Sequence, residues 1–238
     1  MNTYNIGLLK WYDTFVEGGM LDRKDFTECT PVMHSVTKMY DHIFDNYYKC
    51  AYHNFGHLLF CFDELDMYIK DNPTQEMHRF AIKLAIWFHD VVQKETTTAS
   101  AEGLSAQFMS DIFGKFNLVT SPKIKNTLSF AEYIIIVGTT HMPPVRLGNF
   151  IENKVIHDID LAHFAKDDFD HYEKKIREEY SSVPKDEYLR KRIAVLEMFV
   201  SRPVIYYTEH FRNKYEGKAR ANLVKTLSEY RNNACDFS

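Results

Sequence analysis

The sequence is poor in the residues that build strands, turns and cross-links. Only 9 of its 238 residues are glycine and 7 are proline. No stretch longer than about five residues alternates apolar and polar side chains, as a half-buried strand does. The four cysteines form no Cys-x-x-Cys pair, so we expect reduced thiols in a cytoplasmic protein instead of a disulfide framework. These shortages favour an all-α fold.

Long apolar runs and an excess of one charge are also missing. The longest apolar run, Tyr133–Val137, is far too short to span a membrane. The N-terminal stretch "MNTYNIGLLKWYDTF" has no basic segment followed by a long apolar one, so a signal peptide is not expected. The formal net charge is −4, with no broad basic excess, so duplex nucleic acid is not an expected partner.

The sequence is, in contrast, rich in core-forming side chains that recur at helical spacing. It is 45% hydrophobic and 15% aromatic, which is ample for a folded core. On the first predicted helix, Leu9, Trp11 and Phe15 share the face expected to be buried. Further helices are predicted over about 36–44, 51–69, 77–90, 105–116, 121–141, 150–165, 170–180, 185–200 and 209–231. No Pro- or Ser-rich linker separates them, so we expect a single domain over residues 1–238.

Three polar features interrupt this apolar pattern. In "YHNFGH", His53 and His57 are four residues apart, which predicts both imidazoles on one face of a helix. In "WFHDVV", His89 and Asp90 close a predicted helix. In "VIHDIDLAHF", two aspartates lie in an apolar segment, where a carboxylate needs a partner or a metal ion. Two imidazoles with carboxylates suit a divalent transition metal and leave positions for water and substrate.

The order His, His-Asp, Asp on separate helices resembles the HD superfamily of metal-dependent phosphohydrolases. The resemblance covers roughly residues 40–230 and includes "AEGLSA", "TTHMP", "IREEYSSVP" and "KARANL", as in uncharacterised bacterial and phage HD proteins. It implies an HD-type helical bundle. The metal-binding core would span about 40–165, and the C-terminal helices of 166–238 would pack on it.

The resemblance also implies a set of metal ligands. The first would be His57, and the pair would be His89 and Asp90. Asp160, followed by Leu, suits the last ligand, and Asp158 stays open as the alternative. The implied cofactor is one or two divalent ions of Mn, Co, Ni, Fe or Zn, with Mg as a further candidate.

"YHNFGH" is also similar to the HNxxH stretch of cyclic-nucleotide phosphodiesterases. That similarity implies that His53 protonates the leaving oxygen. Asp90 is a candidate for the carboxylate that orients the attacking water. The candidate substrate contacts are His141, Glu102, Arg177 and Arg220. For each, the alternative is a structural role at a helix end or in a surface ion pair.

The function implied is hydrolysis of a phosphoester or phosphoanhydride in a small phosphorylated substrate, with a nucleotide as the first choice. Two alternatives stay open. One is a non-catalytic HD fold that senses a nucleotide. The other is a di-iron HD-type oxygenase, which would need two further histidines between Asp90 and Asp160, where only His141 and His157 occur. The oligomeric state also stays open, a homodimer included.

Overall fold

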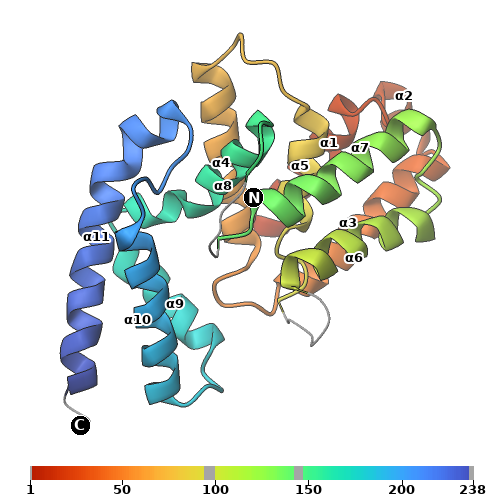
Figure 1. The fold of residues 1–238 in the computed structure, drawn as a ribbon. Helices are drawn as coiled ribbons and strands as arrows, with labels where there is room; N and C mark the ends of the chain where they lie inside the picture. The colour runs from red at the N-terminus through yellow and green to blue at the C-terminus, as the bar shows by residue number, and fades with distance from the viewer. Residues whose placement is uncertain (1, 94–99, 142–146, 236–238) are drawn as a thin grey trace. The chain divides into compact units, whose positions relative to one another are not determined.

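Helices make up all the regular structure that the computed structural model describes, namely residues 2–93, 100–141 and 147–235 (Figure 1). No strand occurs in these ranges, so the all-α prediction is confirmed. The chain divides into two compact units, Met1–Ile156 and His157–Ser238. Cys29, Cys50 and Cys61 form no disulfide in the described part of the chain. None of the helices in the described ranges has the length and apolarity needed to cross a membrane.

The first unit holds most of the helices. They are α1 (Thr3–Glu17), α2 (Arg23–Glu28), α3 (Pro31–Tyr47), α4 (Phe55–Asp71), α5 (Arg79–Phe88), α6 (Ala101–Lys115), α7 (Pro122–Tyr133), the π-helix η1 (Ile134–Gly138) and the first part of α8 (Ile151–Leu161). Side-chain caps define several of their starts. The Ser121 side chain accepts from the backbone N–H of Ile124, and Pro122 occupies the first turn.

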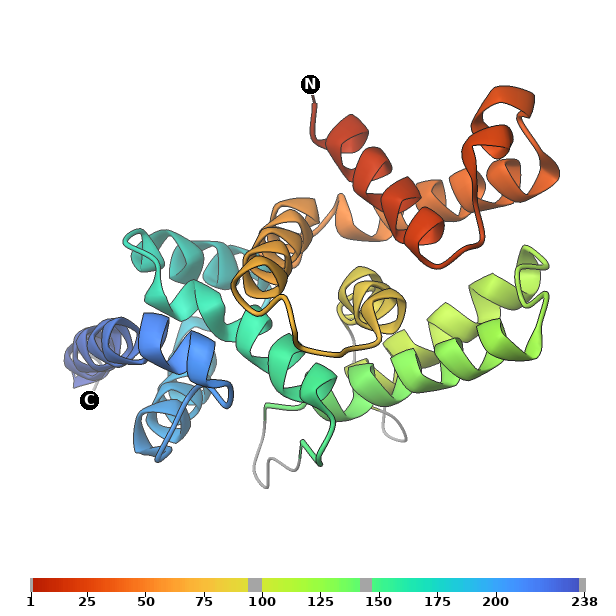
Figure 2. The ribbon, with the colours of Figure 1, turned by 90° about the horizontal axis from the view of Figure 1, so that it is seen from above.

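The core of the first unit is built around α5. This helix contacts α1, α4, α6 and α7, and Figure 2 shows it nearly end-on among them. Trp87 of α5 packs edge-on against Trp11 of α1, with 5.2 Å between ring centroids. The indole N–H of Trp87 donates to the Thr14 hydroxyl at 3.0 Å. The C-terminal end of α5 is therefore fixed by packing and by a buried hydrogen bond.

Two expectations for the first unit are corrected. Leu9 is 54% exposed, because the buried face of α1 carries Gly7, Trp11, Thr14 and Phe15 instead. The short helix α2 was not expected, since none of its residues is buried and it has no apolar stripe to recognise. A capping box between Asp22 and Asp25 marks its start.

The end of α7 changes to the wider π-helical turn over η1. Such turns are rare and often occur at functional sites. The last residue of η1, Gly138, packs against Ile156 and the backbone of Asn153 on α8. A Cβ atom at position 138 would collide with these atoms, so the close approach of η1 to α8 requires glycine.

The second unit begins within α8 and continues through the 3₁₀ turn η2 (Ala162–Ala165), α9 (Phe169–Glu179), α10 (Lys185–Ser201) and α11 (Glu209–Cys235). Helices α10 and α11 lie side by side (Figure 1). The predicted ends of the last three helices agree with these bounds to within about four residues. Inside the unit, the guanidinium of Arg192 forms a buried ion pair with Glu173, whose carboxylate also accepts from the Tyr230 hydroxyl at 3.0 Å.

Candidate metal centre

His57 lies in the first turn of α4 and is 5% exposed. The helix starts there because the Asn54 side chain accepts from the backbone N–H groups of Gly56 and His57, which makes Asn54 the N-cap. His53 therefore precedes α4, and the expectation that both imidazoles lie on one helical face is wrong. The turn before the helix nevertheless keeps the two rings close, with 6.3 Å between their centroids.

His89 is the C-cap residue of α5 and is 2% exposed. Its Nδ1 lies 3.0 Å from the backbone oxygen of Ile86, one turn back along the same helix. A carbonyl oxygen only accepts hydrogen bonds, so this contact assigns a proton to Nδ1. The other ring nitrogen, Nε2, is then available either as a lone pair or as the second N–H of an imidazolium. A backbone carbonyl that fixes the imidazole tautomer in this way is common at metal-binding histidines.

Asp90 brings the two histidines together. Its Oδ2 lies 2.9 Å from Nε2 of His89 and 3.5 Å from Nε2 of His57. The Asp90 side chain is 20% exposed, so this small cluster is buried on one side and accessible on the other. One donor atom from each of these three residues lies within 4.8 Å of the others. The structure thus assembles three of the predicted ligands within the first unit.

The electrostatics of this cluster call for a positive charge. Two imidazole nitrogens and a carboxylate oxygen converge, and a nitrogen lone pair 2.9 Å from a carboxylate oxygen is repelled by it. A proton on the imidazole or a cation between the atoms removes the repulsion. A divalent cation satisfies all three donors at once, whereas a proton pairs only two of them. The donor set of two imidazoles and one carboxylate fits a transition metal ion.

Three further residues lie around the cluster, and two of them, Cys61 and Tyr47, were not recognised from the sequence; Ser105 was a candidate to support a metal-bound water or to bond a ligand, with a capping role as the alternative. The Cys61 sulfur, one turn after His57 on α4, lies 3.7 Å from Nε2 of His57. The Tyr47 hydroxyl donates to the backbone oxygen of Trp87 at 3.1 Å. The Ser105 hydroxyl accepts from the backbone N–H of Val92 at 3.1 Å. Of the two missed residues, only Cys61 carries a sequence signal, because its i+4 spacing from His57 predicts a shared helical face.

The two aspartates of α8 have different surroundings in the second unit. Asp158 is fully buried, and its two oxygens accept from the backbone N–H groups of Tyr207 and Thr208, each at 2.7 Å. Burial raises the pKa of Asp158 to about 7, although these hydrogen bonds oppose the shift. The Asp158 carboxylate therefore stabilises the backbone just before the start of α11. Asp160 is half-buried, and its backbone oxygen accepts from Nδ1 of His163 at 2.8 Å.

The remaining candidates of the first unit lie at helix ends. His53 is half-buried, and its ring packs edge-on against Tyr52, with 4.6 Å between centroids. His141 is half-buried and follows η1, after two threonines whose hydroxyls bond to backbone oxygens of η1. Glu102 is half-buried in the first turn of α6, where a negative charge interacts favourably with the helix dipole.

Two arginines of the second unit, Arg177 and Arg220, were predicted as substrate contacts, and both donate hydrogen bonds to backbone oxygens. Arg220 donates from all three guanidinium nitrogens to Glu216 and to the backbone oxygens of Val200, Arg202 and Pro203. Arg177 donates to the backbone oxygens of Tyr180 and Val183 and stacks over the Tyr188 ring. These contacts close the C-terminal ends of α10 and α9.

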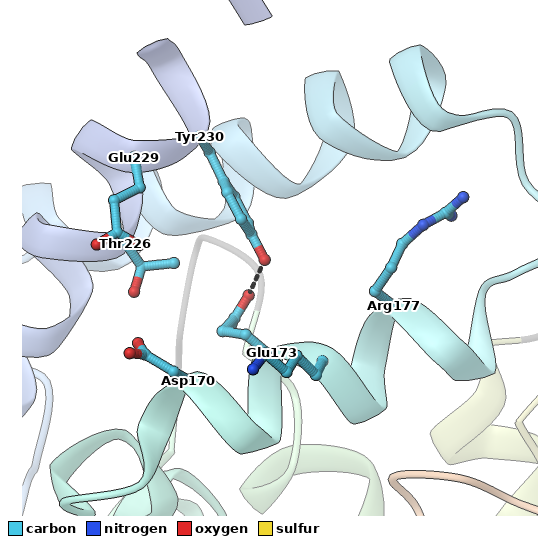
Figure 3. Close-up of a pocket in the computed structure, with 7 residues that line it drawn as sticks. Asp170, Glu173, Arg177, Thr226, Glu229 and Tyr230 are labelled. Carbon is cyan, nitrogen blue, oxygen red and sulfur yellow. Dashed lines mark hydrogen bonds between the residues drawn. The ribbon is translucent and has the colours of Figure 1, made fainter. Parts of the chain in front are cut away.

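A pocket of about 380 Å³ lies between α9 and α11 and includes Arg177 in its lining. Figure 3 shows that Glu173 and Tyr230, joined by a hydrogen bond, form part of its wall. Oppositely charged side chains, among them Asp170 and Lys174, line its other parts. None of the predicted metal ligands belongs to this pocket.

Comparison of the chain with protein-family models, with curated proteins and with solved structures found no match.

Proposed function

We propose that this chain is a metal-dependent phosphohydrolase that holds a divalent transition metal ion through His57, His89, Asp90 and Asp160. The four side chains make a donor set that could hold a metal ion. The observation that carries the proposal is the convergence of Nε2 of His57, Nε2 of His89 and Oδ2 of Asp90. Asp160 joins the set through its place in the sequence pattern, and because the neighbouring carboxylate of Asp158 is committed to backbone amides.

A divalent ion in this set would lower the pKa of a bound water and polarise a phosphoryl oxygen. The protein residues supply the rest. The carbonyl of Ile86 keeps the His89 imidazole oriented, which avoids a reorientation cost during turnover. The Asp90 side chain is partly exposed, so its carboxylate can also orient the attacking water.

His53 is proposed to protonate the leaving oxygen. Its ring lies beside that of His57, at 6.3 Å between centroids, and it is half-buried instead of enclosed in the core. Because His53 precedes the helix, its side chain depends on the turn capped by Asn54 and not on helical spacing. The substrate class proposed is a small phosphorylated molecule, with nucleotides tested first.

The test combines metal analysis with a hydrolysis screen. Purified protein is assayed for bound metal, and then for phosphate release from nucleotides and simple phosphoesters with Mn²⁺, Mg²⁺, Co²⁺ or Ni²⁺ added. We expect His89→Ala and Asp90→Ala to lose metal and turnover together. We expect His53→Ala to keep metal and to lose turnover by about 100-fold, as for removal of a general acid.

A matched control is His34→Ala, because His34 is exposed on α3. It should leave metal content and turnover unchanged. Full activity in His89→Ala would contradict the proposed site. A wild-type protein that binds metal but releases no phosphate from any substrate would favour the non-catalytic sensor. Oxygen consumption with two bound iron ions would favour the oxygenase.

A further inference from the structure

The turn that carries His89 and Asp90 is held from outside α5 by two buried hydroxyl groups. A helix leaves its last backbone carbonyls without intrahelical partners, and the residues that follow it need partners of their own. The Tyr47 hydroxyl donates to the backbone oxygen of Trp87, two residues before His89, at 3.1 Å. The phenol of Tyr47 therefore fixes the last turn of α5, from which His89 follows.

Ser105 holds the other end of the turn. Its hydroxyl accepts from the backbone N–H of Val92 at 3.1 Å and donates to the backbone oxygen of Val92 at 3.4 Å. Tyr47 is the last residue of α3, and Ser105 lies on α6. Side chains from two different helices therefore form hydrogen bonds to the backbone at the end of α5 and just after it.

Both hydroxyl-bearing residues are buried. Tyr47 is 1% exposed and Ser105 is fully buried. When such a hydroxyl is removed, its backbone partners lose a hydrogen bond in a place that water does not easily reach. The consequence falls on the backbone of Trp87–Val92, from which the imidazole of His89 and the carboxylate of Asp90 project.

We infer that Tyr47 and Ser105 are positioning residues for the metal centre: they hold the backbone from which His89 and Asp90 present their donor atoms. This inference rests on the proposed function for its metal, and on the hydrogen bonds alone for its effect on the turn. Neither residue belongs to the candidate donor set. Outer contacts that orient ligands typically change metal affinity by 10- to 100-fold when they are removed.

The test uses Tyr47→Phe and Ser105→Ala in the full chain, with Tyr40→Phe as the matched control. Tyr40 is also a fully buried tyrosine of α3, and its hydroxyl donates to the backbone oxygen of Tyr4 at 2.6 Å, away from the turn. Each protein is measured for its melting temperature without metal and for its Mn²⁺ affinity by calorimetry. Backbone amide hydrogen exchange is measured without metal.

We expect Tyr47→Phe and Ser105→Ala to bind Mn²⁺ about tenfold more weakly than wild type. We expect Tyr40→Phe to bind it with unchanged affinity, although its melting temperature also falls. Equal Mn²⁺ affinities in Tyr47→Phe, Ser105→Ala and wild type would overturn the inference, because a merely structural role lowers only the melting temperature.

Hydrogen exchange separates this inference from the proposed function. Without metal, the Val91 amide, which donates to the backbone oxygen of Phe88 within the turn, should exchange faster in Tyr47→Phe. The Val92 amide should exchange faster in Ser105→Ala, and neither amide should change in Tyr40→Phe. If wild type binds no Mn²⁺, the proposed function fails, and the exchange data alone decide whether the two hydroxyls hold the turn. Unchanged exchange rates at both amides would then also overturn the inference that the two hydroxyls hold the turn.

Discussion

Replacement of Arg192 by methionine should destabilise the second unit strongly. The Arg192 and Glu173 side chains are 14% and 5% exposed, and the guanidinium donates to Glu173 from both Nε and an Nη. Burial lowers the pKa of Arg192, but the adjacent carboxylate of Glu173 outweighs it and raises that pKa further above its usual value. Arg192 therefore stays charged, and each partner of the buried pair depends on the other.

The expected cost follows from these contacts. Two charge-assisted hydrogen bonds have a net value of about 1.5–3 kcal/mol each. Loss of one partner of a buried pair costs about 3–5 kcal/mol, because the remaining charge stays buried. The Tyr230 hydroxyl continues to donate to Glu173 and offsets a part of this loss. We expect Arg192→Met to lower the free energy of unfolding by about 4 kcal/mol.

The assay is urea denaturation of the full chain followed by far-UV circular dichroism, applied to Arg192→Met, Glu173→Leu and the double variant. The double variant should lose much less than the sum of the two single losses, since no unpaired charge remains. Lys225→Met is the control. Lys225 of α11 pairs with Asp170 of α9, the helix that also carries Glu173, but both side chains are more than half exposed, so no measurable change is expected. Additive losses, or a loss below about 1 kcal/mol in Arg192→Met, would refute the reasoning.

Three further predictions concern the first unit. The hydrogen bond from the Tyr4 hydroxyl to Asp41 raises the pKa of Tyr4 to about 12, so the stabilising contribution of this bond is complete below the usual tyrosine pKa of about 10 and is lost as the pH rises through 12. In Asp41→Asn, a pH titration followed by carbon NMR of labelled tyrosines should show the pKa of Tyr4 closer to its usual value. An unchanged Tyr4 pKa in that variant would contradict the assignment. Gly138→Ala should lower the free energy of unfolding, measured by urea denaturation, by about 1–3 kcal/mol, because the new Cβ meets packed atoms of α8. Gly114→Ala on α6, where the new Cβ meets open space, should leave the stability unchanged or raise it. Equal effects of the two changes would show that the close approach of η1 to α8 does not matter for stability. Mn²⁺ at about 100 times its dissociation constant should stabilise the protein by about 2.7 kcal/mol, seen as a higher melting temperature. His89→Ala should abolish this stabilisation. A metal-induced rise in melting temperature that survives the substitution would place the ion elsewhere.

Local signals predicted most of the helices, because each signal acts within one or two turns. Ser121 and Pro122 mark the start of α7 through a side-chain cap and a fixed backbone angle, and both operate without tertiary structure. The prediction for Leu9 was wrong for the opposite reason. The residues that face the core on α1 depend on which neighbours pack there, and Gly7 is buried against Tyr40 and Phe55.

The sequence predicted the candidate ligands of the site, but not the residues that fix the backbone around them. His57, His89 and Asp90 were named from motifs whose chemistry is carried by the side chains themselves. The same reasoning put His53 on the helix, although Asn54 is among the strongest N-cap residues and could have moved the helix start past it. Tyr47 is 40 residues before Trp87 in the sequence and shares no motif or spacing with it, so only the packing of α3 against α5 reveals its hydrogen bond.

The edge-on packing of Trp11 and Trp87 has a spectroscopic consequence, because these are the only two tryptophans in the sequence. Both lie in the core of the first unit, so intrinsic tryptophan fluorescence reports on the melting of that core and is silent for the second unit. Circular dichroism averages over the helices of both units. If the fluorescence and dichroism midpoints separate in Arg192→Met, the two units unfold as independent cooperative blocks, and if they coincide, the chain unfolds as one.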